Sequence, residues 1–490
     1  MDKSYQKPIG RWSIMLMLLI IPLLFISCSD SGTGNTPEEP SQQVSQIQIS
    51  LDNAFIGIGD SLTPEVNVFD RNGQVIAGQS AVWSSDDPSV ADVTSGGTIT
   101  GESPGTTTIQ VMVQDISESI DVEVFRGTGY SAHQLADIDR AVVNYMGQHN
   151  IPGVSVAVVK DGRLVHARGY GYADPEDQSL VEPSAIFRYG SVSKPITSIA
   201  TMMLLEEGLL HLDDKPFEIL NHLPVIGGKS EDPRLADITL EQLLTHFGGW
   251  NSNRDVDNEV WRAVSQMGVR DDAEMFRYGR SVNLAANPGI EYSYTNYATQ
   301  VVGLLIEHIT GTDYEEWVQA NLFEPAGVTN VKFGKAALGD REPNEVRYHR
   351  ANGYRPDVDD GSMDYYGASG SWIGRAVDLM RLLNAVEGKA GLGPVLTTET
   401  IELMTERPDF YSPGGSYYAK FWGIIPASDG LNWHHAGLAD GAFADIWRMS
   451  NGVSYAILMN QSPPGPRPDL RSVLNGISEW PEDDFFAEFY

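Results

Sequence analysis

The chain has 490 residues, which is longer than one hydrophobic core usually supports, so we expect two folded units. Its 66 acidic side chains outnumber the 33 basic ones and give a formal net charge of -33. The sequence holds no cluster of Lys and Arg that could follow a phosphate backbone, which argues against nucleic acid as a partner.

The first 27 residues have the order of a secretory signal peptide. Basic residues precede an apolar run over 12–26, which is short for a helix that crosses a bilayer. Ser27 and Cys28 follow, and the stretch resembles a bacterial lipoprotein box. The resemblance implies cleavage after Ser27 and a lipid on Cys28, which would anchor the protein in the cell envelope, in the periplasm or at the outer membrane. An uncleaved N-terminal anchor is the alternative. Residues 28–43 offer almost nothing apolar to bury and predict a flexible tether.

The next part of the chain has the pattern of short β-strands. Apolar and polar residues alternate over 44–51, and β-branched runs follow at 106–113 and 120–125. Because turn signals separate these runs, the pattern predicts a β-sandwich over 44–126. The sequence between Trp83 and Ile109 resembles the bacterial immunoglobulin-like domains that serve as surface spacers.

From residue 130 to residue 465 the pattern is mixed α and β. A hairpin is predicted near each end, with strands at 154–159 and 164–170, joined by Asp161-Gly162, and at 442–449 and 453–459. Helices are predicted between them, at 196–207, 240–245, 296–310, 314–322 and 375–386. We therefore expect one antiparallel sheet assembled from both ends of the domain, flanked by helices, with a cleft between sheet and helices. Residues 466–490 are predicted to form a C-terminal helix and an acidic tail.

Ser191 and Lys194 are one helical turn apart at the start of an apolar helix. This spacing places both side chains on one side, close enough for the amine to hydrogen-bond the hydroxyl. A desolvated lysine can have a pKa low enough to take the serine proton and make the oxygen a nucleophile. A Ser-x-x-Lys pair also arises by chance, and the alternative is a helix N-cap serine with a surface lysine.

Two further motifs carry polar groups that suit the same chemistry. Tyr294-Thr295-Asn296 is the only Tyr-x-Asn in the chain and opens a predicted helix. A phenol can pass a proton to a leaving group, and an amide can hold both a lysine and a substrate carbonyl. His435-Ala436-Gly437 leads into the last strand pair, where a glycine lets a substrate approach the strand edge. Singly, Tyr294 could equally be a packing aromatic and His435 a hydrogen-bonded strand histidine.

The three motifs in this order resemble the family that joins serine β-lactamases, D-alanyl-D-alanine carboxypeptidases and related esterases, the penicillin-binding-protein-like Ser-x-x-Lys hydrolases. The resemblance runs across most of residues 130–465. With the first resemblance it implies a multidomain chain, in which a small all-β immunoglobulin-like sandwich precedes an α/β (α+β) domain of the β-lactamase kind, with an antiparallel sheet flanked by helices.

The resemblance also assigns roles to individual residues. Ser191 would be the acylated nucleophile, Lys194 its base or proton relay, and Tyr294 the group that protonates the leaving group. Which of Lys194 and Tyr294 is the general base stays open. The remaining roles are substrate binding, implied for Asn296, His435 and Gly437, and the oxyanion hole, implied for the backbone N–H groups of Ser191 and Leu438.

One departure from the family pattern bears on the substrate. Many β-lactamases carry Lys at the position of His435, where a fixed cation holds the substrate carboxylate, so His435 argues against potent antibiotic hydrolysis. The expected substrate is a small molecule or peptide with an amide or ester bond: a D-amino-acid peptide, a peptidoglycan fragment, an ester or a β-lactam. The alternative is an inactive envelope binding or adhesion protein with a hydrolase-like fold. No cofactor or metal is implied, because the histidines lack metal-ligand spacing.

Overall fold

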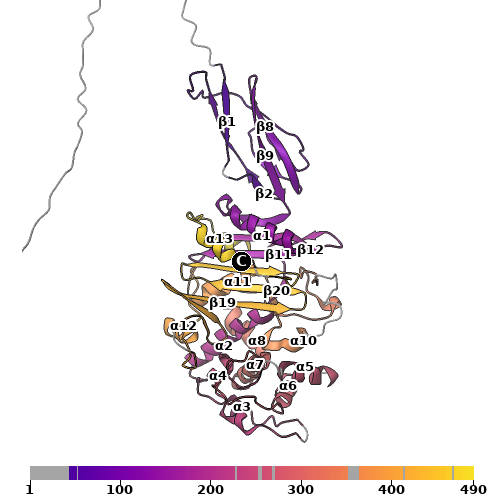
Figure 1. Ribbon diagram of the computed structural model, residues 1–490, viewed down its shortest axis with the longest axis vertical. Coiled ribbons are helices and arrows are strands. Elements are labelled where there is room, and N and C mark those ends of the chain that lie inside the picture. The colour runs from indigo at the N-terminus through magenta and orange to yellow at the C-terminus, as the bar shows by residue number, and fades with distance from the viewer. Residues whose placement is uncertain are drawn as a thin grey trace, which may run out of the picture. The chain divides into compact units, whose positions relative to one another are not determined.

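The computed structural model describes residues 43–51, 53–226, 229–251, 256–267, 271–350, 363–411, 414–465 and 468–490. Residues from Val44 to Tyr490 form one compact unit. Within it a small all-β sandwich precedes a larger domain, in which helices cover both faces of a β-sheet (Figure 1). The fold class predicted from the sequence is confirmed.

The sandwich is built from short strands whose apolar side chains alternate with polar ones. In the longest pair, β8 and β9, the side chains of Ile109, Val111, Val122 and Val124 are buried. This alternation places one face of each strand in the core and leaves the other in water. The strands are β1 Gln46–Ser50, β2 Phe55–Gly57, β3 Ser61–Leu62, β4 Glu65–Phe69, β5 Val82–Ser85, β6 Ala91–Val93, β7 Ile99–Gly101, β8 Gly105–Val113 and β9 Ile116–Phe125.

The main sheet of the larger domain joins the two ends of that domain, as the sequence predicts. Its strands follow the order β10-β12-β11-β21-β20-β19-β18-β17, and every neighbouring pair is antiparallel. The strands are β10 Gly127–Ser131, β11 Gly153–Lys160, β12 Arg163–Asp174, β17 Tyr417–Tyr418, β18 Gly423–Ala427, β19 Gly430–Ala439, β20 Ala442–Arg448 and β21 Val453–Met459, with β13 Ser179–Leu180 beside β12. A separate small sheet holds β14 Phe187–Arg188, β15 Lys332–Phe333 and β16 Trp372–Gly374.

The predicted hairpin between β11 and β12 turns at Asp161-Gly162. Both residues have positive φ, +49° for Asp161 and +88° for Gly162. A two-residue hairpin loop with a type I′ turn needs positive φ at both positions, and an Asp-Gly pair adopts it with little strain.

The main sheet separates two hydrophobic cores. On one face Val154, Val156 and Val158 of β11 pack with α1 Ala136–His149 and α13 Leu470–Gly476. On the other face Ala157 and Val159 pack with α2 Ser193–Glu206 and α11 Ala376–Val386. Because both faces are covered, the central strands are apolar along most of their length.

The helices that carry the candidate site lie on the second face. The predicted helices correspond to α2, α4, α7, α8 and α11, and the helix predicted within 466–490 corresponds to α13, whereas α1, α3, α5, α6, α10 and α12 were not predicted. Predicted helix 314–322 is shorter, because α8 ends at Val318 and a π-helical turn follows at Gln319–Phe323. The remaining bounds are α3 Pro216–Ile219, α4 Leu240–Leu244, α5 Val256–Met267, α6 Asp272–Gly279, α7 Asn296–Thr310, α8 Tyr314–Val318, α10 Met363–Tyr366 and α12 Thr398–Thr405.

The acidic aromatic tail that ends the chain is docked on the larger domain. The backbone N–H of Leu164 donates to the carboxylate of Asp484 at 3.1 Å, and the phenol of Tyr490 donates to Asp378 at 2.5 Å. Phe486, between them, is buried in the same hydrophobic cluster as α2 and α11. The tail is therefore part of the folded domain.

Contacts between the sandwich and the larger domain lie within the same compact unit. The Arg168 guanidinium of β12 meets the carboxylate of Asp60 at 2.6 Å, and the ring of Phe125 stacks on that of Tyr170 with 5.9 Å between centroids. Asp60 belongs to a turn in which its N–H donates to the carbonyl of Gly57.

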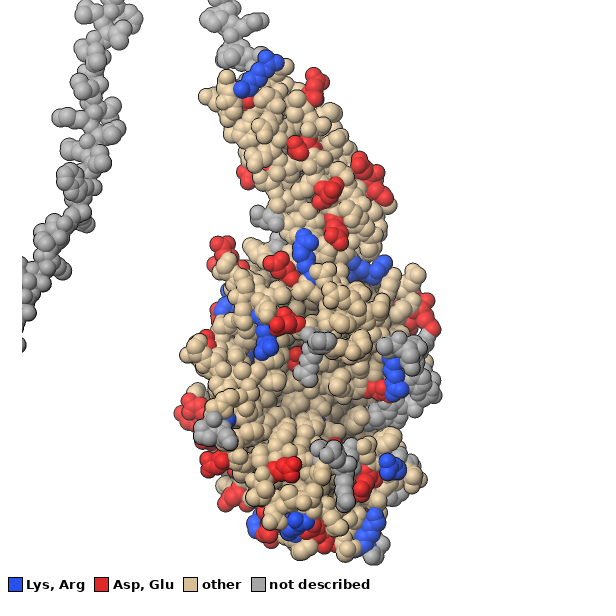
Figure 2. Space-filling view, viewed as in Figure 1, with Lys and Arg blue, Asp and Glu red and all other residues tan. Residues whose placement is uncertain are grey.

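None of the helices in the described ranges is long and apolar enough to cross a membrane. On the face shown in Figure 2, acidic side chains are scattered over both the sandwich and the larger domain. The excess negative charge is thus spread over this face and does not form a single patch there.

Candidate active site

Ser191 lies in a tight turn that leads into α2. The turn is a 3-10 helix over Gly190–Val192, and α2 begins at Ser193. Ser191 is half-buried, whereas every residue from Val192 to Ala200 is buried. The hydroxyl therefore stands at the one accessible position of an otherwise enclosed helix start.

Lys194 lies one turn further on and is fully buried, with 0% of its side chain exposed. Its Nζ donates to Ser191 Oγ at 3.2 Å, to Asn296 Oδ1 at 2.6 Å and to the backbone carbonyl of Ser369 at 3.0 Å. The alternative of a surface lysine beside an N-cap serine is therefore wrong. Burial lowers the pKa of Lys194 to about 7, and the nearby Asp257 carboxylate opposes that shift.

Tyr294 and Asn296 stand at the N-terminus of α7. Asp257 holds this helix start, because its carboxylate accepts hydrogen bonds from the backbone N–H of Asn296 at 2.7 Å and of Tyr297 at 2.8 Å. The Lys194 Nζ lies 4.8 Å from the centroid of the Tyr294 ring. Burial raises the pKa of Tyr294 far above its usual value, and a hydrogen bond with Ser191 offsets part of that shift. At neutral pH the phenol is therefore a proton donor.

The strand β19 passes directly behind the Ser191 turn. A Cβ atom built on Gly437 would lie 1.9 Å from the carbonyl oxygen of Tyr189 and 2.9 Å from the backbone N of Ser191. A Cβ on Gly190, whose φ is +50°, would lie 2.8 Å from the carbonyl oxygen of Leu438. Both glycines are needed for this close approach, which places the backbone of Leu438 beside the Ser191 turn.

His435 lies on β19 two residues before Gly437, and its ring centroid is 6.4 Å from that of Tyr294. Its Nδ1 donates to the backbone carbonyl of Ala436 at 2.9 Å, and its Nε2 lies 2.8 Å from the phenol oxygen of Tyr418. The side chain is buried, with 6% exposed. The structure thus brings together Ser191, Lys194, Tyr294, Asn296, His435 and Gly437, with the backbone of Leu438. The predicted lipidation residue, Cys28, lies outside the described residues.

The sequence reasoning missed several residues that complete this arrangement. Asp257 and Ser369 hold Asn296 and Lys194, and Tyr418 holds His435. His246 supports the segment of Tyr294, since its backbone carbonyl accepts from Ser293 N–H at 2.8 Å and its ring packs 4.4 Å from the Tyr294 ring. Only His246 could have been found from the sequence, because the stretch Leu-Leu-Thr-His-Phe-Gly-Gly over 243–249 also resembles the family named above. The contacts of the other three residues depend on tertiary structure.

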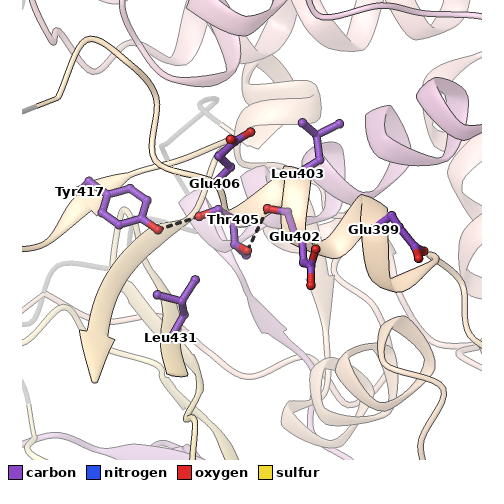
Figure 3. A pocket seen from close by; sticks show the side chains of 7 residues that line it. All are labelled: Glu399, Glu402, Leu403, Thr405, Glu406, Tyr417 and Leu431. Atoms are coloured by element: carbon purple, nitrogen blue, oxygen red, sulfur yellow. Dashed lines mark hydrogen bonds between the residues drawn. The ribbon is translucent and has the colours of Figure 1, made fainter. Parts of the chain in front are cut away.

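A separate hollow of about 450 Å³ lies beside α12. It is lined by Glu399, Glu402, Leu403, Thr405, Glu406, Tyr417 and Leu431, and the Tyr417 phenol donates to the Thr405 carbonyl (Figure 3). None of the candidate catalytic residues lines it. Within the described ranges, no group of three or more His, Cys, Asp and Glu side chains is arranged to hold a metal ion.

Comparison with protein-family models gives two matches along the chain. The family described as Beta-lactamase matches residues 138–475, and the Bacterial Ig-like domain (group 2) matches residues 44–124. The resemblances inferred from the three motifs and from the segment near Trp83 are thereby confirmed.

Two individual proteins are similar to part of this chain. PbpX of Bacillus subtilis (strain 168), named after the penicillin-binding proteins, is 27% identical over 319 residues, which cover 62% of this chain and 72% of PbpX. Protein flp of Staphylococcus aureus (strain N315) is 26% identical over 221 residues, which cover 44% of this chain but only 40% of flp.

Two solved structures share the fold. The octameric penicillin-binding protein homologue from Pyrococcus abyssi is 25% identical, with a TM-score of 0.56 over 67% of this chain and 74% of that one. The D-alanine carboxypeptidase AmpC from Burkholderia cenocepacia is 21% identical, with a TM-score of 0.57 over 70% of this chain and 98% of that one. The latter likeness supports the fold alone.

If Lys194 acts as a general base, its pKa determines how ester hydrolysis depends on pH. An amine accepts a proton only in its neutral form, which predominates above a pKa of about 7, so kcat/KM should rise as pH increases through about 7. In Asp257→Asn the carboxylate that raises the Lys194 pKa is lost, so the midpoint should move down by roughly half a pH unit or more. The measurement is kcat/KM for a neutral ester between pH 5 and pH 9, a range that extends about two pH units to either side of the Lys194 pKa.

Asp271→Asn is the matched control, because Asp271 also caps a helix with its carboxylate, accepting from the N–H groups of Ala273 and Glu274. This control should keep the wild-type midpoint. A flat profile, or an Asp257→Asn midpoint equal to that of the wild type, would contradict the assignment.

The close approach of β19 predicts the effect of Gly437→Ala. The new methyl group would overlap the backbone of Tyr189, which cannot rotate away, so β19 must move from the Ser191 turn. If the two segments form an oxyanion hole, activity should fall by about 10²-fold or more. Gly476→Ala is the control, since its Cβ would meet nothing within 4 Å. Unchanged kcat in Gly437→Ala, with the fold intact by circular dichroism, would count against an oxyanion hole at this place.

Proposed function

We propose that this chain, which belongs to the beta-lactamase family, is a serine hydrolase that cleaves an amide or ester through an acyl-enzyme on Ser191. The observation that carries the proposal is the pairing of a half-exposed hydroxyl with a fully buried amine 3.2 Å away. A buried lysine with no catalytic task would cost free energy that a neutral apolar residue would avoid.

The hydrogen bonds of Lys194 support its role as the base in acylation. A neutral amine has two N–H bonds and one lone pair. Asn296 Oδ1 and the Ser369 carbonyl can each take one N–H, which leaves the lone pair for the Ser191 proton. The pKa of about 7 makes both forms of the amine accessible near neutral pH, whereas burial keeps Tyr294 protonated. The lowered pKa of Lys194 and the raised pKa of Tyr294 favour Lys194 as the base and Tyr294 as the acid.

The proposed reaction then has two balanced halves. The Ser191 proton passes to Lys194 while Oγ bonds to the substrate carbonyl carbon, and the carbonyl electron pair moves onto its oxygen. The backbone N–H groups of Ser191 and Leu438 would stabilise that oxyanion. Collapse expels the leaving group, which takes a proton from the Tyr294 phenol, and Lys194 returns its proton to Tyr294. In the second half, water gives a proton to Lys194 and attacks the carbonyl carbon of the acyl-enzyme. Ser191 Oγ then leaves with a proton from Tyr294, and Lys194 returns its proton to Tyr294.

The proposal is tested by covalent labelling of the full chain. A fluorophosphonate probe should add its mass to the peptide containing Ser191 and to no peptide of Ser191→Ala. Hydrolysis of a neutral 4-nitrophenyl ester should fall by about 10³-fold or more in Ser191→Ala, because the covalent route is lost. Ser230→Ala, at an exposed position, should label and turn over as the wild type does. Native folding without any label at Ser191 would point instead to an inactive, binding role.

We also infer that the protein is anchored in the cell envelope by a lipid on Cys28. The support is the order of basic residues, apolar run and Ser27-Cys28 at the N-terminus. In a bacterial host a palmitate analogue should label the wild-type protein and should not label Cys28→Ser, whereas Ser29→Ala should keep the label. Equal labelling of Cys28→Ser and the wild type would reject a lipid at this cysteine.

A further inference from the structure

A continuous group of aromatic rings borders the candidate site on the side of Tyr294. The Tyr294 ring lies 4.4 Å from that of His246 and 6.3 Å from that of Tyr418, and Tyr418 lies 5.8 Å from Tyr292. Tyr292 in turn lies 6.0 Å from Phe247. We call this group the aromatic wall; its members are His246, Phe247, Tyr292, Tyr294, Tyr411, Tyr418 and Phe421.

The aromatic wall reaches from the buried site to the surface. Tyr294 is half-buried, while Tyr292 is 40% exposed and Leu438, beside the Ser191 turn, is 61% exposed. Sites lined by aromatic and apolar side chains favour apolar ligands. Tyr292 and Leu438 therefore present exposed apolar surface near the candidate site.

The hydrogen bonds of His435 match a neutral imidazole. Nδ1 carries a hydrogen, because its partner, the Ala436 carbonyl, can only accept. Nε2 lies 2.8 Å from the phenol oxygen of Tyr418, whose pKa burial raises well above its usual value; in the neutral imidazole, Nε2 accepts the hydrogen of this phenol. In that neutral form His435 offers no full positive charge to an anionic group of a substrate.

Resting on the proposed hydrolase function, we propose that Tyr418 and His435, together with the aromatic wall, select substrates that carry no carboxylate next to the reacting bond. The favoured class is neutral esters and amides with an apolar or aromatic group on at least one side of the carbonyl. A carboxylate placed here would lose its hydration without gaining a cation. The net charge of -33 would also repel an anionic substrate during its approach.

The test compares matched neutral and anionic esters with the full chain. One pair differs in the acyl group, 4-nitrophenyl butyrate against mono-4-nitrophenyl glutarate, and the other in the leaving group, phenyl acetate against 4-carboxyphenyl acetate. After division by the uncatalysed rates, kcat/KM should be at least about tenfold higher for the neutral member of each pair. An equal or higher value for the anionic members would overturn the inference.

Variants test whether the pair of residues causes the preference. His435→Lys places a cation on β19 and should raise the anionic-to-neutral ratio by about tenfold or more. Tyr418→Phe removes the hydroxyl that pairs with Nε2 of the neutral imidazole, and should raise the same ratio to a smaller extent. Tyr417→Phe is the control, because Tyr417 binds the Thr405 carbonyl, away from His435, and its ratio should stay unchanged. If the anionic-to-neutral ratio is unchanged in both Tyr418→Phe and His435→Lys, and both variants are folded, neither residue selects the substrate.

The failures of the two proposals are distinguishable. If ester turnover survives in Ser191→Ala, the proposed hydrolase site itself is wrong. If turnover requires Ser191 but favours the carboxylate-bearing esters, only the substrate selection is wrong.

Discussion

The site depends on the removal of one ammonium group from water. Lys194 is enclosed by α2, α7 and the segment before β16, and its Nζ meets only oxygen atoms of Ser191, Asn296 and Ser369 among its hydrogen-bond partners within the described residues. Desolvation penalises the charged amine, while these oxygens and Asp257 favour it. The balance places the pKa of Lys194 near neutral pH, where an amine can both take and return a proton.

The second constraint is the contact of two backbones. The Ser191 turn and β19 approach so closely that a Cβ at Gly190 or Gly437 would overlap the backbone of the opposite segment. This contact can form only because the sheet is assembled from both ends of the domain, which brings β19 next to a turn more than two hundred residues earlier in the sequence. Each reactive group is thus carried by a different rigid element, and the packing of those elements fixes the distances between groups.

Much of this arrangement could be predicted from the sequence, for reasons of local geometry. The Ser191–Lys194 pair follows from the helical period, and the turn at Asp161-Gly162 follows from the residues that tolerate positive φ. Strands with apolar runs at both ends of the domain predicted the shared sheet. The roles of the predicted residues came from the resemblance to a family, and they are proposals that the contacts support.

What could not be predicted depends on contacts between distant segments. Asp257 binds the start of a helix some forty residues later in the chain, and Tyr418 of β17 meets His435 of β19 across the strand β18 that lies between them. Neither has a motif, since an acidic residue in a helix and a tyrosine in a short strand are common. The burial of Lys194 was also invisible, because the spacing of the pair is the same for an exposed lysine. Only the folded structure distinguishes a buried Lys194 from an exposed one.

The protonation state of Lys194 is the most direct test of this account, and it can be measured without a substrate. Nitrogen NMR of protein with ¹⁵Nζ-labelled lysine would follow each amine as pH changes, with Lys194→Met identifying the resonance. The account predicts that the Lys194 amine titrates near pH 7, well below the ordinary value for lysine. An amine that stays fully protonated above about pH 9, as an unperturbed lysine does, would contradict it.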